Sequence, residues 1–144
     1  MSKTLRRIQV RWLGDYRTEI SVRGVHTLNG DETPQYGGQD SGPMPTELLL
    51  AGVASCMCLA VSHVARKRRI TLGDLAVSAE AEKDLKEFRF HSIALLVQAD
   101  LPQAELEALV ARAKDYCFVS NTLIHGCAVN TASQSTQASS EGQP

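Results

Sequence analysis

The chain has 144 residues, of which 43% are hydrophobic, and a formal net charge of -1. These values are typical of one globular domain with its own core, and the lack of a basic excess argues against nucleic acid as a partner. Four cysteines without an export signal predict a cytoplasmic protein with reduced thiols, whose cysteines would serve catalysis or metal binding.

The N-terminal part is expected to form strands followed by a loop. Apolar and polar residues alternate over residues 6–12 and again over 16–22, with a Gly-Asp turn between them, which predicts an antiparallel hairpin with one buried face. Residues 25–28 are a candidate third strand. Residues 29–43 are rich in Gly, Pro, Asn and Asp, so they predict a loop, either a functional segment or a solvated connector.

The next segment, residues 43–69, contains the longest apolar run of the chain, from 48 to 64. Pro45 suits the first position of a helix, Glu47 lies where the positive end of the helix dipole favours it, and four basic residues close the stretch. The pattern predicts a helix of about six turns. Because this helix is apolar all round, it must be buried on every side by the rest of the chain, by a partner subunit or by both.

A membrane span is the alternative interpretation of this helix. A span needs about 20 consecutive apolar residues, whereas this run has about 17 and is interrupted by Ser55, Ser62 and His63. The sequence also contains no N-terminal apolar region typical of a signal peptide. We therefore expect no membrane anchor.

Strands and a second helix follow the apolar run. Residues 75–82 and 88–99 predict two strands, the second with a bulge near His91 and Ser92. Residues 101–116 then show apolar residues at helical spacing. The mixture of antiparallel strands and helices predicts an α+β fold.

The C-terminal part is expected to contain only short elements. Residues 117–123 predict a short helical turn or loop, and residues 125–131 a last strand. The tail, residues 132–144, is rich in Ser and Gln and is expected to be disordered. The chain would thus be one domain, residues 1–131, with a C-terminal tail.

The cysteines allow a metal site or a redox site. Cys56 and Cys58 form a C-x-C pair, and His63, His125 and Cys127 are further candidate zinc ligands. On a helix, residues two apart point about 200° away from each other, so one ion cannot easily bind both cysteines. The usual paired zinc spacings are also missing.

Cys56 and Cys117 are the candidate redox pair, because a thiolate at one cysteine and a nearby thiol at the other could form and resolve a sulfenic acid. Cys56 is too far from the N-terminus of its helix for the dipole to activate it. A cation must then come from elsewhere, and an Arg of the N-terminal hairpin is the natural source. Spacing alone also allows two buried, inert thiols.

Several segments resemble the OsmC/Ohr family. They are WLGDYRTE, NGDETPQYGG, GPMPTELLLAGVASC, KEFRFHSIALLVQADLP and YCFVSNTL, and they cover nearly the whole chain apart from the tail. The motif P-x-E-L-L-L-A-x-x-x-x-C followed by C-x-V-S is specific in this order. Within the family, the chain is more similar to the general OsmC-like branch than to the organic hydroperoxide resistance branch.

The resemblance implies a thiol-dependent peroxidase that reduces organic hydroperoxides or hydrogen peroxide in a stress response. Cys56 matches the peroxidatic cysteine and Cys117 the resolving one, whereas Cys58 and Cys127 match no family position. The catalytic Arg of the family comes from the N-terminal region, where Arg17 is the best match. Arg11 is the second candidate.

The resemblance also implies an OsmC-like fold, in which antiparallel sheets are wrapped around the long central helix of an intertwined homodimer with active sites at the subunit interface. The expected partners are a second copy of the chain, a hydroperoxide substrate and an external dithiol reductant. No metal and no organic cofactor is expected.

Two positions depart from the family pattern. Phe118 follows the second cysteine where characterised peroxidases usually have Pro, and Thr46 occupies the position of a family carboxylate. Glu47, one residue later, is the remaining candidate for the catalytic acid, although a continuous helix would turn it about 180° away from Cys56. These departures leave two alternatives to the peroxidase, namely a non-catalytic redox sensor or binding scaffold, and a structural zinc protein.

Overall fold

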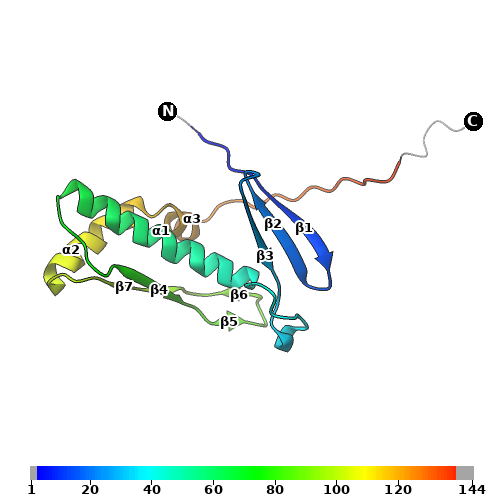
Figure 1. Ribbon diagram of the computed structural model, residues 1–144, viewed down its shortest axis with the longest axis horizontal. Helices are drawn as coiled ribbons and strands as arrows, with labels where there is room; N and C mark the ends of the chain where they lie inside the picture. The colour runs from blue at the N-terminus through cyan, green and yellow to red at the C-terminus, as the bar shows by residue number, and fades with distance from the viewer. Residues whose placement is uncertain (1–2, 139–144) are drawn as a thin grey trace, which may run out of the picture.

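The computed structural model describes residues 3–138 and has an α+β fold (Figure 1). Its longer strands are β1 (Ile8–Gly14), β2 (Arg17–Val22), β3 (His26–Gly30), β4 (Ala76–Glu80) and β7 (Ala94–Gln98). Two short strands are β5 (Lys83–Asp84) and β6 (Arg89–Phe90). The α-helices are α1 (Pro45–Lys67), α2 (Gln103–Ala113) and α3 (Phe118–His125), and two 3-10 turns are η1 (Pro34–Tyr36) and η2 (Lys114–Tyr116).

The N-terminal strands form the predicted antiparallel hairpin. Strands β1 and β2 pair antiparallel, with Val10 opposite Ile20, and β3 adds a third strand. This sheet projects beyond the N-terminal end of α1 (Figure 1). The face expected to be buried is open to solvent in the single chain, where Trp12 is 71% exposed. The alternation therefore predicted the strands correctly, but this chain alone does not cover their apolar side.

The core is built around α1, which begins at Pro45 as predicted because proline has the backbone geometry of a first helical residue. The helix packs against α2, α3 and β4, and β4 pairs antiparallel with β7. The buried residues of α1 lie mainly in its C-terminal half, which includes the fully buried Val61. Leu109 of α2 is also fully buried. By length and composition α1 could also cross a membrane, and 33% of its most apolar window is buried inside the chain. The single chain thus covers only part of a helix that was expected to be buried on every side.

Two predictions about the later elements need correction. The segment 88–99 is not one bulged strand, since it is divided into β6 and β7 by irregular residues around His91. Residues 125–131 form no strand, because α3 continues to His125 and Gly126 then ends it with a positive φ of 74°. Residues 132–138 contain neither helix nor strand, and the rest of the predicted disordered tail, residues 139–144, lies outside the described residues.

The loop before α1 is organised by one buried carboxylate, Asp31. Its oxygens accept hydrogen bonds from the backbone N–H groups of Glu32 (2.7 Å), Gln39 (3.3 Å) and Ser41 (3.0 Å), and from the Ser41 hydroxyl (2.6 Å). These bonds, led by the one from the Ser41 hydroxyl, lower the pKa of Asp31 from 3.8 to about 2. A side chain at Gly38 would overlap the carbonyl oxygen of Glu32, so this loop is tightly closed.

The depressed pKa of Asp31 predicts an acid-sensitive fold. A carboxylate with a lower pKa in the folded state stabilises the protein fully above pH 3.8, and this contribution is lost as the pH falls toward about 2. We expect Asp31→Asn to be less stable than the wild type in urea at pH 7, with a difference that narrows as the pH falls. Asp40→Asn, an exposed position in the same loop, is the control. A difference of equal size from pH 7 to pH 2 would contradict this role.

Candidate active site

Cys56 lies in the middle of α1 and is half-buried. Its neighbours in sequence differ, since Ser55 is exposed and Met57 is buried. The side chain of Cys56 packs against the hydrophobic core cluster formed mainly by α1 and α2. The first predicted redox residue is therefore held by the most extensively packed helix of the chain.

Cys117 belongs to the same core cluster and is 0% exposed. It lies between η2 and α3, where its thiol donates a hydrogen bond to the Ser120 hydroxyl (3.0 Å) and its carbonyl oxygen accepts one from the Asn121 N–H (2.9 Å). Both Cys56 and Cys117 are free thiols. The fold thus brings two cysteines, 61 positions apart in the sequence, to one hydrophobic core.

The other candidate ligands do not form a metal site. Cys58 is half-buried and Cys127 is exposed, and both are free thiols. In residues 3–138, no three of Cys56, Cys58, His63, His125 and Cys127 come close enough to share an ion. The geometry therefore gives no support to the structural zinc interpretation.

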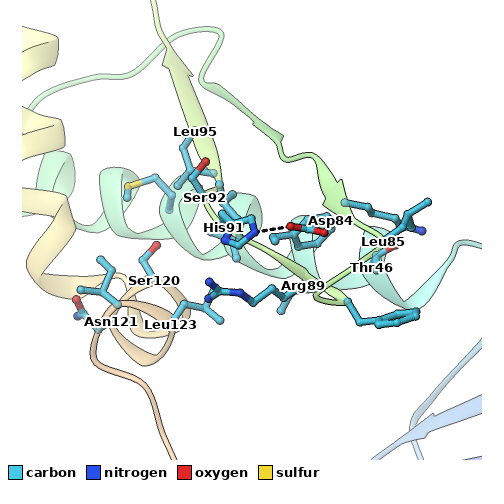
Figure 2. A pocket seen from close by; sticks show the side chains of 18 of the residues that line it. Thr46, Asp84, Leu85, Arg89, His91, Ser92, Leu95, Ser120, Asn121 and Leu123 are labelled. Atoms are coloured by element: carbon cyan, nitrogen blue, oxygen red, sulfur yellow. Dashed lines mark hydrogen bonds and ion pairs between the residues drawn. The ribbon is translucent and has the colours of Figure 1, made fainter.

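A cavity of about 1160 Å³ lies on the side of α1 that faces β5, β6 and β7 (Figure 2). Helix α1 contributes Thr46, Val53 and Met57 to its wall, and α3 contributes Ser120 and Leu123. Most of its lining side chains are apolar, as expected for a site that takes an organic molecule. Neither Cys56 nor Cys117 lines this cavity. Cys56 precedes the lining residue Met57 in the sequence, and Cys117 is hydrogen-bonded to the lining residue Ser120.

Arg17, the best candidate for the activating cation, lies at the start of β2 and is half-buried. Its Nε is shielded from solvent and has no hydrogen-bond partner among the described residues. Arg11, the second candidate, is exposed and lies opposite Glu19 in the hairpin. Within residues 3–138, no hydrogen bond or ion pair joins either Arg to Cys56 or to Glu47.

Glu47 acts as a capping residue at the start of α1. Its side chain is exposed to solvent, and its Oε1 accepts a hydrogen bond from the Met44 N–H (2.8 Å), one of the donors that a helix start leaves unpaired. Thr46, the departure from the family pattern, is half-buried, and its hydroxyl oxygen is buried with no hydrogen-bond partner in the described part of the chain. A catalytic role for Glu47 stays a prediction, whereas its capping contact is present.

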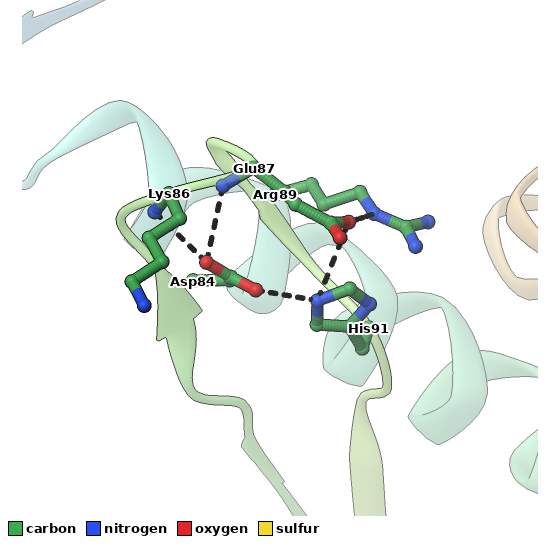
Figure 3. Close-up of polar contacts among 5 residues, drawn as sticks. All are labelled: Asp84, Lys86, Glu87, Arg89 and His91. Carbon is green, nitrogen blue, oxygen red and sulfur yellow. Dashed lines mark hydrogen bonds and ion pairs between the residues drawn. The ribbon is translucent and has the colours of Figure 1, made fainter.

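A second polar cluster, which the sequence analysis missed, is formed by residues of β5, β6, the turn between them and His91 directly after β6 (Figure 3). His91 Nε2 is 2.7 Å from Asp84 Oδ2 and 3.6 Å from Glu87 Oε2, and Glu87 also accepts a hydrogen bond from Arg89 (2.9 Å). The His91 contact, with the N–H groups of Glu87 and Lys86, lowers the pKa of Asp84. One side-chain atom each of Asp84, Glu87 and His91 could bind a metal ion, and these three atoms lie within 4.8 Å of one another. Asp84 and His91 also line the cavity.

Comparison with known proteins identifies the family. A model of the family described as OsmC-like protein matches residues 38–132, which is more than half of the chain. The chain belongs to the OsmC-like protein family. The predicted family and the predicted fold class are therefore confirmed.

Solved structures with the OsmC-like fold support this assignment. An organic hydroperoxide resistance protein OsmC from Legionella pneumophila is 27% identical and has a TM-score of 0.71, with 85% of this chain and 91% of that chain covered. An OsmC-like protein from Mycoplasma pneumoniae has a TM-score of 0.73 over 86% of this chain and 89% of that chain. At 19% identity, this second likeness concerns the fold alone.

One curated relative is similar in sequence. It is an uncharacterized protein of Methanocaldococcus jannaschii, which is 23% identical over 122 residues. The match covers 81% of this chain but only 61% of that protein. This relative therefore adds no information about activity, substrate or partner.

Substitution of Glu47 separates capping from catalysis. We expect Glu47→Ala to lower the free energy of unfolding by about 0.5–1 kcal/mol, because the Met44 N–H loses its acceptor. We expect Glu47→Gln to retain most of the stability, since the amide oxygen accepts the same bond. Urea denaturation measures the free energy of unfolding, and a peroxide-consumption assay measures any catalytic role of Glu47. Normal stability of Glu47→Ala combined with lost peroxide consumption would instead support the catalytic role.

Proposed function

We propose that this OsmC-like protein is a thiol-dependent peroxidase that reduces organic hydroperoxides or hydrogen peroxide. The observation that carries the proposal is the common core of Cys56 and Cys117, in which one thiol is half-buried and the other is fully buried and hydrogen-bonded. The similarity to an organic hydroperoxide resistance protein of Legionella pneumophila agrees with this chemistry. The apolar cavity beside α1 favours an organic peroxide over hydrogen peroxide.

The proposed cycle has three balanced steps. The Cys56 thiolate attacks one oxygen of the peroxide, the O–O bond breaks, and the alcohol or water leaves with a proton, so that Cys56 becomes a sulfenic acid. The Cys117 thiol then attacks the Cys56 sulfur, a disulfide forms, and water leaves. An external dithiol finally reduces the disulfide, which regenerates both thiols and leaves the reductant as a disulfide.

The proposed role of Arg17 is to stabilise the Cys56 thiolate and to polarise the peroxide. Two features support Arg17 over Arg11, namely its partial burial and the unpaired, buried Nε. A guanidinium donor without a partner in the described chain is available for a substrate oxygen or a thiolate. Proximity to Cys56 would follow from the assembly of two subunits, which this chain alone does not contain.

A non-catalytic redox sensor or binding scaffold is the second candidate function. It is favoured by Thr46, whose buried hydroxyl has no partner in the described residues where the family pattern has a carboxylate, and by Phe118, which replaces the usual Pro and is largely exposed. Such a protein would form the disulfide but would not turn over. Steady-state consumption of peroxide in the presence of a dithiol distinguishes the two functions.

We also propose that the protein works as a cytoplasmic homodimer with active sites at the subunit interface. The support comes from apolar surface that the single chain leaves open, including Leu59 on α1, which is 69% exposed, and Trp12 on β1. Large apolar side chains left exposed on a core helix and on the apolar face of a strand favour contact with a second protein surface. A second copy that covers α1 and β1 would complete the burial that the sequence demands of both elements.

Peroxide oxidation tests the proposed chemistry. One equivalent of an organic hydroperoxide should remove two hydrogens from the reduced protein in intact mass spectrometry, with Cys56 and Cys117 joined in the peptide map. Cys56→Ser should lose the reaction, whereas the matched control Cys58→Ser should react like the wild type. Oxidation of Cys58 in place of Cys56 would show that the residue assignment is wrong. Disulfide formation without steady-state turnover would support the sensor.

Sedimentation tests the proposed dimer. The wild type should sediment as a dimer at micromolar concentration, and Leu59→Asp should shift it toward the monomer, because a charge would then be buried in the interface. Val25→Asp is the control, since Val25 is equally exposed but lies in the turn between β2 and β3. A folded wild-type monomer in analytical ultracentrifugation would contradict the proposal.

A further inference from the structure

The two cysteines of the proposed pair differ in their access to solvent. Cys117 is 0% exposed and lies in the core cluster with Val61 and Leu109, whereas Cys56 is half-buried on α1. A second subunit can only reduce these exposures, and Cys117 has none to lose. Cys56, which keeps part of its surface exposed, is therefore the member of the pair that an external reductant can reach in this chain, whereas Cys117 offers it no surface.

The surroundings of Cys117 also suit a leaving group. Cys117 directly precedes α3, whose positive N-terminal end favours a negative charge. The Ser120 hydroxyl, which now accepts a hydrogen bond from the Cys117 thiol, can rotate and donate one to a thiolate. Cys56 lies in the middle of α1, far from either end of the helix dipole. Since thiol–disulfide exchange is faster when the departing thiolate is more stable, these contacts assist a cleavage that releases Cys117. The proposed contact with Arg17 would stabilise the Cys56 thiolate as well, so the choice of the attacked sulfur rests on the difference in exposure.

We infer that the external dithiol attacks the Sγ atom of Cys56 and that Cys117 is the leaving group, with Ser120 as the positioning residue that holds it. This inference rests on the proposed peroxidase or sensor cycle. The reductant thiolate forms a mixed disulfide with Cys56, the bond between Cys56 and Cys117 breaks, and the Cys117 thiolate takes up a proton. The second thiol of the reductant then attacks its own mixed-disulfide sulfur, which releases the Cys56 thiolate and the oxidised reductant.

Trapping the mixed disulfide tests which sulfur is attacked. The experiment uses the Cys58→Ser, Cys127→Ser protein, so that only the proposed pair can react. The protein is oxidised with one equivalent of organic hydroperoxide, and the loss of two hydrogens is verified. Glutathione is then added as a monothiol probe, the reaction is quenched with acid, and free thiols are alkylated before peptide mapping.

The expected product carries glutathione on Cys56 and the alkyl label on Cys117. Glutathione on Cys117 would overturn the inference, as would reduction of the disulfide at the wild-type rate without any adduct on Cys56. If the hydroperoxide removes no hydrogens in the first step, the proposed cycle itself fails. The two failures are therefore distinguishable.

Variants of α3 test the role of Ser120. We expect Ser120→Ala to slow the reduction of the disulfide by dithiothreitol about tenfold, because the leaving thiolate loses a hydrogen bond. Ser120→Thr should restore the rate, and Thr122→Ala is the control, since the Thr122 hydroxyl donates its hydrogen bond to the Phe118 carbonyl oxygen and not to a cysteine. The ratio of the reduction rate to the rate at which peroxide oxidises Cys56 should fall in Ser120→Ala and stay at the wild-type value in Thr122→Ala. An unchanged reduction rate in Ser120→Ala, or equal slowing of oxidation and reduction, would exclude this role.

Discussion

The structure depends on covering one long apolar helix. Helix α1 has apolar residues on every side, and each square ångström of apolar surface left in water forgoes about 25 cal/mol of stabilisation. Helix α2 and strand β4 cover its C-terminal half, where Val61 and Ala65 are buried. Leu49 and Leu59 remain exposed. The same requirement gives the fold its core, its cavity and its proposed need for a second subunit, and Cys56 lies in the middle of the helix on which all three depend.

Much of the fold could be predicted from local patterns, because local geometry determines it. Alternation predicted β1, β2 and their antiparallel pairing, and the fixed backbone angle of Pro45 predicted the first residue of α1. The last predicted strand was wrong, because the residues after Cys117 continue as a helix until Gly126 ends it. The burial of Trp12 could not be judged from the pattern, since burial belongs to the complete assembly whereas alternation belongs to one strand.

The candidate site also contains residues that the sequence indicated and residues that it did not. The motifs point to Cys56 and Cys117, and the fold places both at one core, while their redox role stays a prediction. The carboxylate of Asp31 and the pair of Asp84 and His91 were missed, because their contacts depend on turns that bring together residues seven to ten positions apart. The partner of Arg17 could not be inferred either, because strand register fixes the face on which a side chain lies but not what it meets there.

The two segments that carry the cysteines differ in how firmly they are packed into the fold. Cys56 belongs to a helix of 23 residues with six buried side chains, so a shift of its backbone would disturb the whole core. Cys117 precedes an eight-residue helix with no buried residue, in which Phe118 and Ile124 are exposed. The approach of the two sulfurs during disulfide formation would thus fall to the segment of Cys117, the thiol that is most hidden but carried by the less anchored backbone. Burial would protect this thiol between cycles, and weak anchoring would let it move when Cys56 is oxidised.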